Sequence, residues 1–207
     1  MNARSEAPDR PGTTDLGMWV FLASEVLFFG ALLNGFLVYR IAYPESFGAG
    51  SAELDFWLGG INTGVLLTSS LTMALAVAAV RAGRLRATLL ALGATALLGC
   101  LFLGVKAIEY SQEIAHGLAP WRPGATFALG AGDPGRIELF FNFYFAMTGL
   151  HAVHLLVGIG VVVVVLARAV RAGTAAVAAP VEGTGLYWHF VDVIWIFLYP
   201  MLYLIPG

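Results

Sequence analysis

Five long apolar runs constrain the fold of this chain more than any other feature of its sequence. Each run is long enough to cross a bilayer as one helix, which takes about 20 residues. The segments between the runs hold most of the charged residues, and charged residues make up only 12% of the 207 residues, against about 25% in a soluble domain. The sequence therefore predicts an all-α polytopic membrane protein, a bundle of five transmembrane helices at about residues 16–40, 56–80, 87–108, 138–166 and 185–205.

The segments outside these runs are short. Residues 1–15 are polar and rich in charged and small residues, which predicts a flexible tail. Residues 16–207 are predicted to form a single transmembrane domain. No tandem repeat of about 20–50 residues and no inverted pair of broken helices is recognisable in the sequence, so a repeat-built transporter is not favoured.

Arginine is distributed unevenly between the two sides of the predicted bundle. The tail, residues 81–86 and residues 168–184 together hold seven arginines, whereas the loops on the other side hold few basic residues. Basic loops are retained on the cytoplasmic side of a membrane. We therefore expect the N-terminus to face the cytoplasm and the C-terminus to lie outside.

Composition and missing motifs exclude several functions. A net charge of −2 gives no basic surface for nucleic acid. The single cysteine, Cys100, can form no internal disulfide, and no CxxC pair is present for zinc or covalent haem. The sequence also lacks the nucleophile-elbow, Walker and zinc-hydrolase motifs. We therefore expect no catalytic residue and no metal or cofactor site in this chain.

Glu25 lies in the middle of the first apolar run. A carboxylate there costs at least ~2.5 kcal/mol, so the neutral acid is favoured unless donors or a cation stabilise the charge. One interpretation is an acid that handles protons or contacts lipid headgroups. The other is a protonated glutamate that bonds to a neighbouring helix for packing. The residues alone leave both open.

His151 and His154 lie three residues apart and share a face of the fourth predicted helix. They are either ligands for haem or metal, or hydrogen-bonded histidines in a helix interface. One such pair cannot occupy both axial positions of a haem, so a bis-histidine haem would need His189 on the fifth helix. We favour the interface.

Two further pairs have the same three-residue spacing. His189 and Asp192 open the fifth helix and are predicted to form an ion pair that anchors it, with a proton relay as the alternative. Lys106 and Glu109 close the third helix, where we expect a lysine that reaches the headgroups and pairs with the glutamate.

Four segments of the sequence resemble the signatures of subunit III of the haem-copper oxidases, specifically of cytochrome c oxidase. In order, they are WVFLASEVLFFG (19–30), INTGVLLTSSLT (61–72), ELFFNFYFAMTGLHAVHLLVG (138–158) and YWHFVDVIWIFLY (187–199), with a weaker match in KAIEYSQEIAHG (106–117). The resemblance covers nearly everything after residue 15. The chain is similar to the short bacterial form, which lacks the first two helices of the seven-helix subunit.

The resemblance implies an accessory role in a bacterial cytoplasmic membrane. Subunit III of this family binds no haem or copper itself. It packs mainly against the catalytic subunit I, with subunit II and further subunits nearby, and those partners carry the haem and copper. It binds phospholipid and supports proton uptake during oxygen reduction. The matched polar positions in this chain are Glu25, Glu109, His151, His154, His189 and Asp192.

Other assignments compete with this one. The short form also occurs in quinol oxidases and in a homologue associated with nitric oxide reduction, so the electron donor stays open. From a different class, a haem-binding membrane cytochrome would use His151, His154 and His189. A small transporter would use Glu25 and the hydroxyl groups of the second predicted helix.

Overall fold

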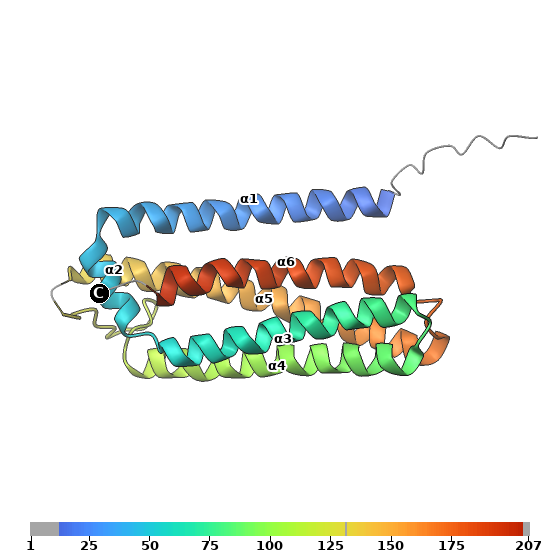
Figure 1. Cartoon of the computed structure of the whole chain (residues 1–207). Coiled ribbons are helices and arrows are strands. Elements are labelled where there is room, and N and C mark those ends of the chain that lie inside the picture. Colours follow the sequence, from blue (N-terminus) through green and yellow to red (C-terminus); the bar gives the residue numbers. More distant parts are fainter. Residues whose placement is uncertain (1–12, 131, 205–207) are drawn as a thin grey trace, which may run out of the picture.

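The computed structural model describes residues 13–130 and 132–204, and these residues form six α-helices and no strand. Five of the helices are long and apolar enough to cross a membrane, which confirms the predicted all-α bundle of five spans. The helices are α1 (Thr13–Ala42), α2 (Pro44–Ala52), α3 (Phe56–Arg81), α4 (Leu85–Ala115), α5 (Pro134–Ala172) and α6 (Ala178–Tyr203) (Figure 1).

Most helices extend beyond the predicted apolar runs, because polar and small residues continue them at their ends. α5, for example, starts four residues before the run predicted from hydropathy. Pro134 occupies its first turn, and the Asp133 carboxylate accepts a hydrogen bond from the Arg136 backbone N–H, an arrangement that starts a helix. Residues 1–12 of the predicted tail lie outside the described residues, and α1 already begins at Thr13.

The short helix α2 was not predicted, since its sequence PESFGAGSA has weak helix propensity. Packing holds it in place. The fully buried Phe47 ring lies 5.3 Å from the Phe36 ring and 5.6 Å from the Phe140 ring. Ser51 donates a hydrogen bond to the Leu202 carbonyl at 2.6 Å. α2 thereby connects α1 with α5 and the end of α6.

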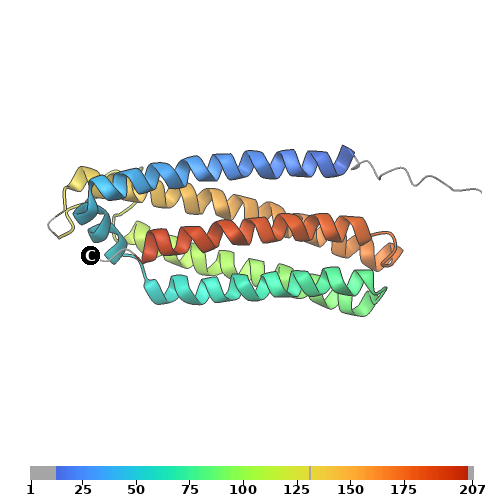
Figure 2. The ribbon, with the colours of Figure 1, turned by 45° about the horizontal axis from the view of Figure 1, so that its top comes forward.

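α3, α4, α5 and α6 form an antiparallel four-helix bundle, and α1 lies along one side of it against α5 and α6 (Figures 1 and 2). Two fully buried indoles, Trp188 and Trp195, fill the centre of the bundle. Gly99 and Gly158 make room for Trp188, since a Cβ on either residue would lie about 3 Å from its ring. Most of the large apolar side chains of α1 are exposed, as expected for a helix that faces lipid or a partner.

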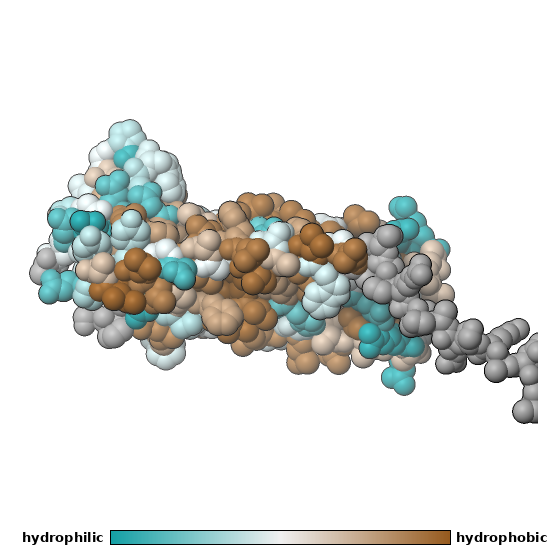
Figure 3. Space-filling view, turned by 90° about the horizontal axis from the view of Figure 1, so that it is seen from above, coloured by the Kyte–Doolittle hydropathy of each residue, from teal (hydrophilic) through white to brown (hydrophobic). Residues whose placement is uncertain are grey.

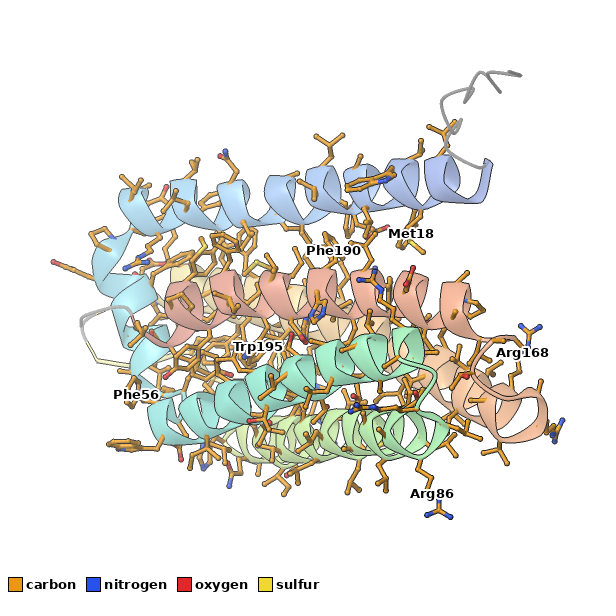
Figure 4. The ribbon with its side chains drawn as sticks, turned by 45° about the vertical axis from the view of Figure 1, so that its right-hand side comes forward. Met18, Phe56, Arg86, Arg168, Phe190 and Trp195 are labelled. Carbon is orange, nitrogen blue, oxygen red and sulfur yellow. The ribbon has the colours of Figure 1, made fainter. Side chains whose placement is uncertain are left out.

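The surface is banded along the helix axes. Apolar residues cover the middle of the α1 face, and polar residues gather at both ends (Figure 3). Arg86 and Arg168 lie at one end of the bundle, and Phe56 lies at the other (Figure 4). The arginine-rich connections thus share one end, as the orientation argument requires. Which side of a membrane that end faces stays a prediction.

Candidate functional site

Four of the polar side chains that the sequence places inside the spans form two separate pairs, Glu25 with His154 and Lys106 with Glu109, and each pair is the centre of a cluster. The first joins α1 to α5. Glu25 Oε2 lies 3.1 Å from His154 Nε2. Both side chains are largely but not fully buried, with exposures of 18% and 16%. Glu25 therefore has a partner on a neighbouring helix.

The other nitrogen of His154 bonds to the backbone of its own helix. His154 Nδ1 lies 2.9 Å from the Leu150 carbonyl oxygen. A carbonyl can only accept, so Nδ1 carries a hydrogen and donates it. Nε2 is then the nitrogen left to bond to the Glu25 carboxyl group. This arrangement serves the packing role and the proton-handling role equally well.

Aromatic side chains enclose this cluster. The Phe29 ring lies edge-on to the His154 ring at 5.3 Å, and Tyr187 donates a hydrogen bond to the His154 carbonyl at 2.9 Å. Two adjoining apolar hollows of about 340 and 850 Å³ open beside Tyr187 toward the arginine-rich end, between α1, α5 and α6. They share Met18, Val161, Gly183 and Thr184, and the larger one ends at Arg168 and Glu182. Met18 points from α1 toward α6 (Figure 4).

The second cluster surrounds Lys106 at the other end of the bundle. The predicted pair with Glu109 is present, since Lys106 Nζ lies 3.1 Å from Glu109 Oε1. The predicted location was wrong, because the side chains are only 5% and 1% exposed. The lysine side chain does not reach the surface of the bundle. It points into the bundle, where aromatic residues of α4, α5 and α6 surround it.

Two tyrosines complete this buried ion pair. Lys106 Nζ contacts the Tyr203 hydroxyl at 2.9 Å and the Tyr144 hydroxyl at 3.2 Å. Both hydroxyls donate hydrogen bonds to Glu109 Oε1. The ammonium also lies 4.9–5.6 Å from the ring centres of four aromatic residues, close enough for cation–π attraction. The pair thus connects α4 to α5 and to the last turn of α6.

The remaining sequence-predicted residues lie elsewhere. The expected ion pair between His189 and Asp192 is absent from the part of the chain that the structure describes, so that prediction was wrong. His189 Nδ1 instead lies 2.7 Å from the Ser70 hydroxyl on α3. Asp192 is buried next to the bundle centre. His151 is also buried, with its ring 5.0 Å from Trp195 and 5.6 Å from Phe102.

The histidines therefore do not converge on one ligand. His154 faces Glu25, His189 faces Ser70, and His151 packs between aromatic rings. Among residues 13–130 and 132–204, no group of three or more His, Cys, Asp or Glu side chains is arranged to hold a metal ion. The donor set needed by the alternative of a bis-histidine haem is not assembled within this chain.

Sequence reasoning missed Tyr144 and Tyr203, which bond to Lys106 and Glu109. It also missed Tyr110, whose ring centre lies 5.2 Å from Lys106 Nζ and whose hydroxyl contacts Thr148, and the buried Glu113 one turn further along α4. One signal was available. Lys106, Glu109 and Glu113 are spaced at i, i+3 and i+7, which places them on one helix face. The tyrosines gave no such signal, because tyrosine near a helix end is ordinarily an interfacial residue.

The fold and these clusters define a class: a multi-pass membrane protein whose buried polar side chains bond to one another across helices. The chain belongs to the cytochrome c oxidase subunit III family, because the model of that family matches residues 10–206. It is 32% identical over 205 residues to a "Cytochrome c oxidase subunit 3" of Thermostichus vulcanus, covering 98% of this chain and 92% of the relative.

Two further relatives show the range of names. A "Cytochrome c oxidase subunit 3" of Alkalihalophilus pseudofirmus is 33% identical, over 91% of this chain and 85% of its own length. A "Cytochrome bo(3) ubiquinol oxidase subunit 3" of Pseudomonas aeruginosa is 29% identical, over 96% of this chain and 88% of its own length. The family match confirms the resemblance seen in the sequence, and the chain is a subunit III of the haem-copper oxidases that works with other oxidase subunits.

Proposed function

We propose that this chain is the accessory third subunit of a bacterial haem-copper terminal oxidase in the cytoplasmic membrane. It packs against subunit I and lies near subunit II, and these two partner subunits hold the haem and copper. It binds phospholipid and supports the proton uptake that accompanies oxygen reduction. The chain performs no redox step itself, and its arginine-rich end faces the cytoplasm.

One observation carries the proposed role in proton uptake. Two polar residues from separate family-like segments, Glu25 in SEVLFF and His154 in TGLHAVH, meet at 3.1 Å, which is hydrogen-bonding distance. A pair of this kind can take up or release a proton without moving a helix, since only the hydrogen between the carboxyl group and the imidazole changes place. Its partial exposure gives it access to the surroundings.

The apolar hollows beside α1 support the proposed lipid binding. The larger one, of about 850 Å³, combines apolar walls from α1, α5 and α6 with the guanidinium of Arg168 at its end. Apolar walls suit an acyl chain, and an arginine at the membrane boundary suits a phosphate headgroup. A phospholipid held there would bridge α1 to the four-helix bundle.

Isolation of the tagged full-length chain from bacterial membranes tests the assignment. We expect oxidase subunits I and II to co-purify, together with their haem absorption. The chain released from that complex should show no Soret band. Purification without any oxidase subunit, or a stoichiometric Soret band on the released chain, would refute the proposal.

The electron donor requires a separate assay, because relatives of both kinds exist. Oxygen consumption by the purified complex with reduced cytochrome c, compared with a reduced quinol, separates the two. We propose cytochrome c as the donor, since several of the relatives carry that oxidase name. Activity with quinol alone would reassign the complex.

A further inference from the structure

A third groove lies between α3 and α4, the two helices that lie across the bundle from α1 (Figure 1). Its volume is about 540 Å³, and its α3 wall runs from Thr72 to Ala82. Among the described residues, α1 contacts α2, α5 and α6 but neither α3 nor α4. This α3–α4 groove is therefore separate from the two hollows beside α1.

The walls of the α3–α4 groove are apolar. Five of its nine lining residues are alanines, so small side chains leave the space open, and Leu75 and Leu90 are two of the others. The Thr72 hydroxyl also lines it, but that hydroxyl already donates to the Ser69 carbonyl at 2.8 Å. The groove thus offers its occupant apolar contacts along most of its length.

The length of the groove matches one leaflet of a bilayer. The ten residue steps from Thr72 to Ala82 correspond to about 15 Å at a rise of about 1.5 Å per residue. The hydrocarbon core of a bilayer is about 30 Å thick, so one leaflet contributes about half of it. An acyl chain of a single leaflet can therefore lie along the whole groove.

Positive charge lies at one end of the groove. Arg84 lines it there, and residues 56–108 contain no aspartate or glutamate. Arg81 is paired with Glu182 of α6, whereas the α3–α4 hairpin supplies no carboxylate to Arg84. Arg84 is also the N-cap of α4, and no side chain of the described residues caps that helix. The guanidinium and the first N–H groups of α4 both favour an anion at this end.

We propose that the α3–α4 groove binds an anionic phospholipid. Its phosphate bonds to Arg84 and to the N-terminus of α4, and one acyl chain lies between α3 and α4. A guanidinium can donate two parallel hydrogen bonds to a phosphate. A zwitterionic lipid fits less well, because its ammonium group would find no carboxylate on residues 56–108. The site does not depend on which oxidase contains the chain.

Photolabelling of the full-length chain, in the complex with which it purifies, tests this site. The preparation is reconstituted into phosphatidylcholine nanodiscs that contain a photoreactive phosphatidylglycerol. A parallel sample contains a phosphatidylcholine with the same photoreactive acyl chain. Leu90 is the reporter. Leu97 is the matched control, because it lies two turns further along the same face of α4, outside the groove, and is 71% exposed against 76% for Leu90.

The measured quantity is the labelling yield with the phosphatidylglycerol probe divided by that with the phosphatidylcholine probe, obtained for each leucine by mass spectrometry. We expect this ratio to be about fivefold higher at Leu90 than at Leu97, which is the preference that one arginine near the headgroups gives an anionic lipid. Equal ratios would show ordinary contact with bulk lipid and overturn the proposal. Absence of labelling at Leu90 with both probes would also overturn it, since another chain would then fill the groove.

Two variants test the role of the guanidinium. Arg84→Gln should lower the ratio at Leu90 to that at Leu97. Arg86→Gln is the control, because Arg86 points away from the bundle and does not line the groove (Figure 4). It should change the ratio by less than about twofold, since salt screens charges at a distance. Equal losses in the two variants would show a general attraction to the basic connection and refute the site.

Discussion

Replacement of Lys106 by methionine should destabilise this protein more than any loss of a surface ion pair. Methionine has nearly the same length and keeps the apolar packing of the lysine stem, so the change removes mainly the ammonium group. In the native protein that group contacts Glu109 Oε1 at 3.1 Å, Tyr203 at 2.9 Å and Tyr144 at 3.2 Å. Without it, the Glu109 carboxylate stays buried with only two tyrosine hydroxyls.

The magnitude follows from burial. Breaking a buried ion pair by removing one partner costs about 3–5 kcal/mol, because an uncompensated charge stays behind. The Arg81–Glu182 pair is the internal control. Its N···O distance of 2.7 Å is shorter than that of the buried pair, but its side chains are 66% and 42% exposed. Arg81→Met should therefore cost about 0–1 kcal/mol.

Equilibrium unfolding by sodium dodecyl sulfate in mixed micelles, followed by far-ultraviolet circular dichroism, measures both variants. A third variant separates charge from packing. Lys106→Met combined with Glu109→Gln removes both charges of the pair and leaves no unpaired carboxylate at position 109, so it should be more stable than Lys106→Met alone. If Lys106→Met is no less stable than Arg81→Met, or if the double variant is the least stable, the buried ion pair does not stabilise the bundle as argued.

Three other changes test the remaining contacts. Glu25→Gln should keep assembly and the initial rate of oxygen reduction, because the amide can still donate to His154 Nε2, whereas proton uptake over sustained turnover should fall, because the amide cannot release a proton. Immediate loss of the metal-centre spectra would show that Glu25 is structural for the catalytic subunit. His151→Leu should weaken retention of the chain in the complex but should not remove haem or copper from it. Analysis of the iron and copper content of the purified complex checks this, and loss of either metal would contradict the prediction. Gly50→Ala should lower the free energy of unfolding by about 1–3 kcal/mol in the same assay, since its Cβ would lie 2.5 Å from the Phe140 ring. Gly64 has open space around it, so Gly64→Ala should leave the free energy of unfolding unchanged or raise it by up to about 1 kcal/mol. Equal effects of the two substitutions would refute the packing argument.

The spans were predictable because the bilayer imposes one requirement on every crossing segment. All backbone groups must be bonded internally, so an apolar run of sufficient length can only be a helix. α1 and α3–α6 follow from that rule. α2 does not, because PESFGAGSA carries no apolar periodicity. Its helix depends on Phe47 meeting Phe36 and Phe140, a contact among residues far apart in sequence.

The site residues were partly predictable for a related reason. An ionisable residue inside an apolar run stands out in any sequence, which identified Glu25, Lys106 and Glu109. Their partners lie on other helices, and helix rotation decides which side chains meet. The three-residue spacing of His189 and Asp192 was equally conspicuous, but Ser70 on α3 is the residue that reaches His189. Spacing along one helix predicts a shared face, not a bond.

The two clusters differ in what they can exchange with their surroundings. Glu109 and Lys106 are buried almost completely, and a proton that left this pair would strand a charge inside the bundle. The side chains of Glu25 and His154 are about one-sixth exposed and lie next to the smaller apolar hollow beside α1. Their contact forms while His154 Nδ1 stays bonded to the Leu150 carbonyl. Since α1 touches the bundle less than the other spans do, the same contact also attaches it there. Proton exchange in this chain is therefore expected at Glu25 and His154, and the Lys106 cluster is expected to hold α4, α5 and α6 together whatever the protonation of the first pair.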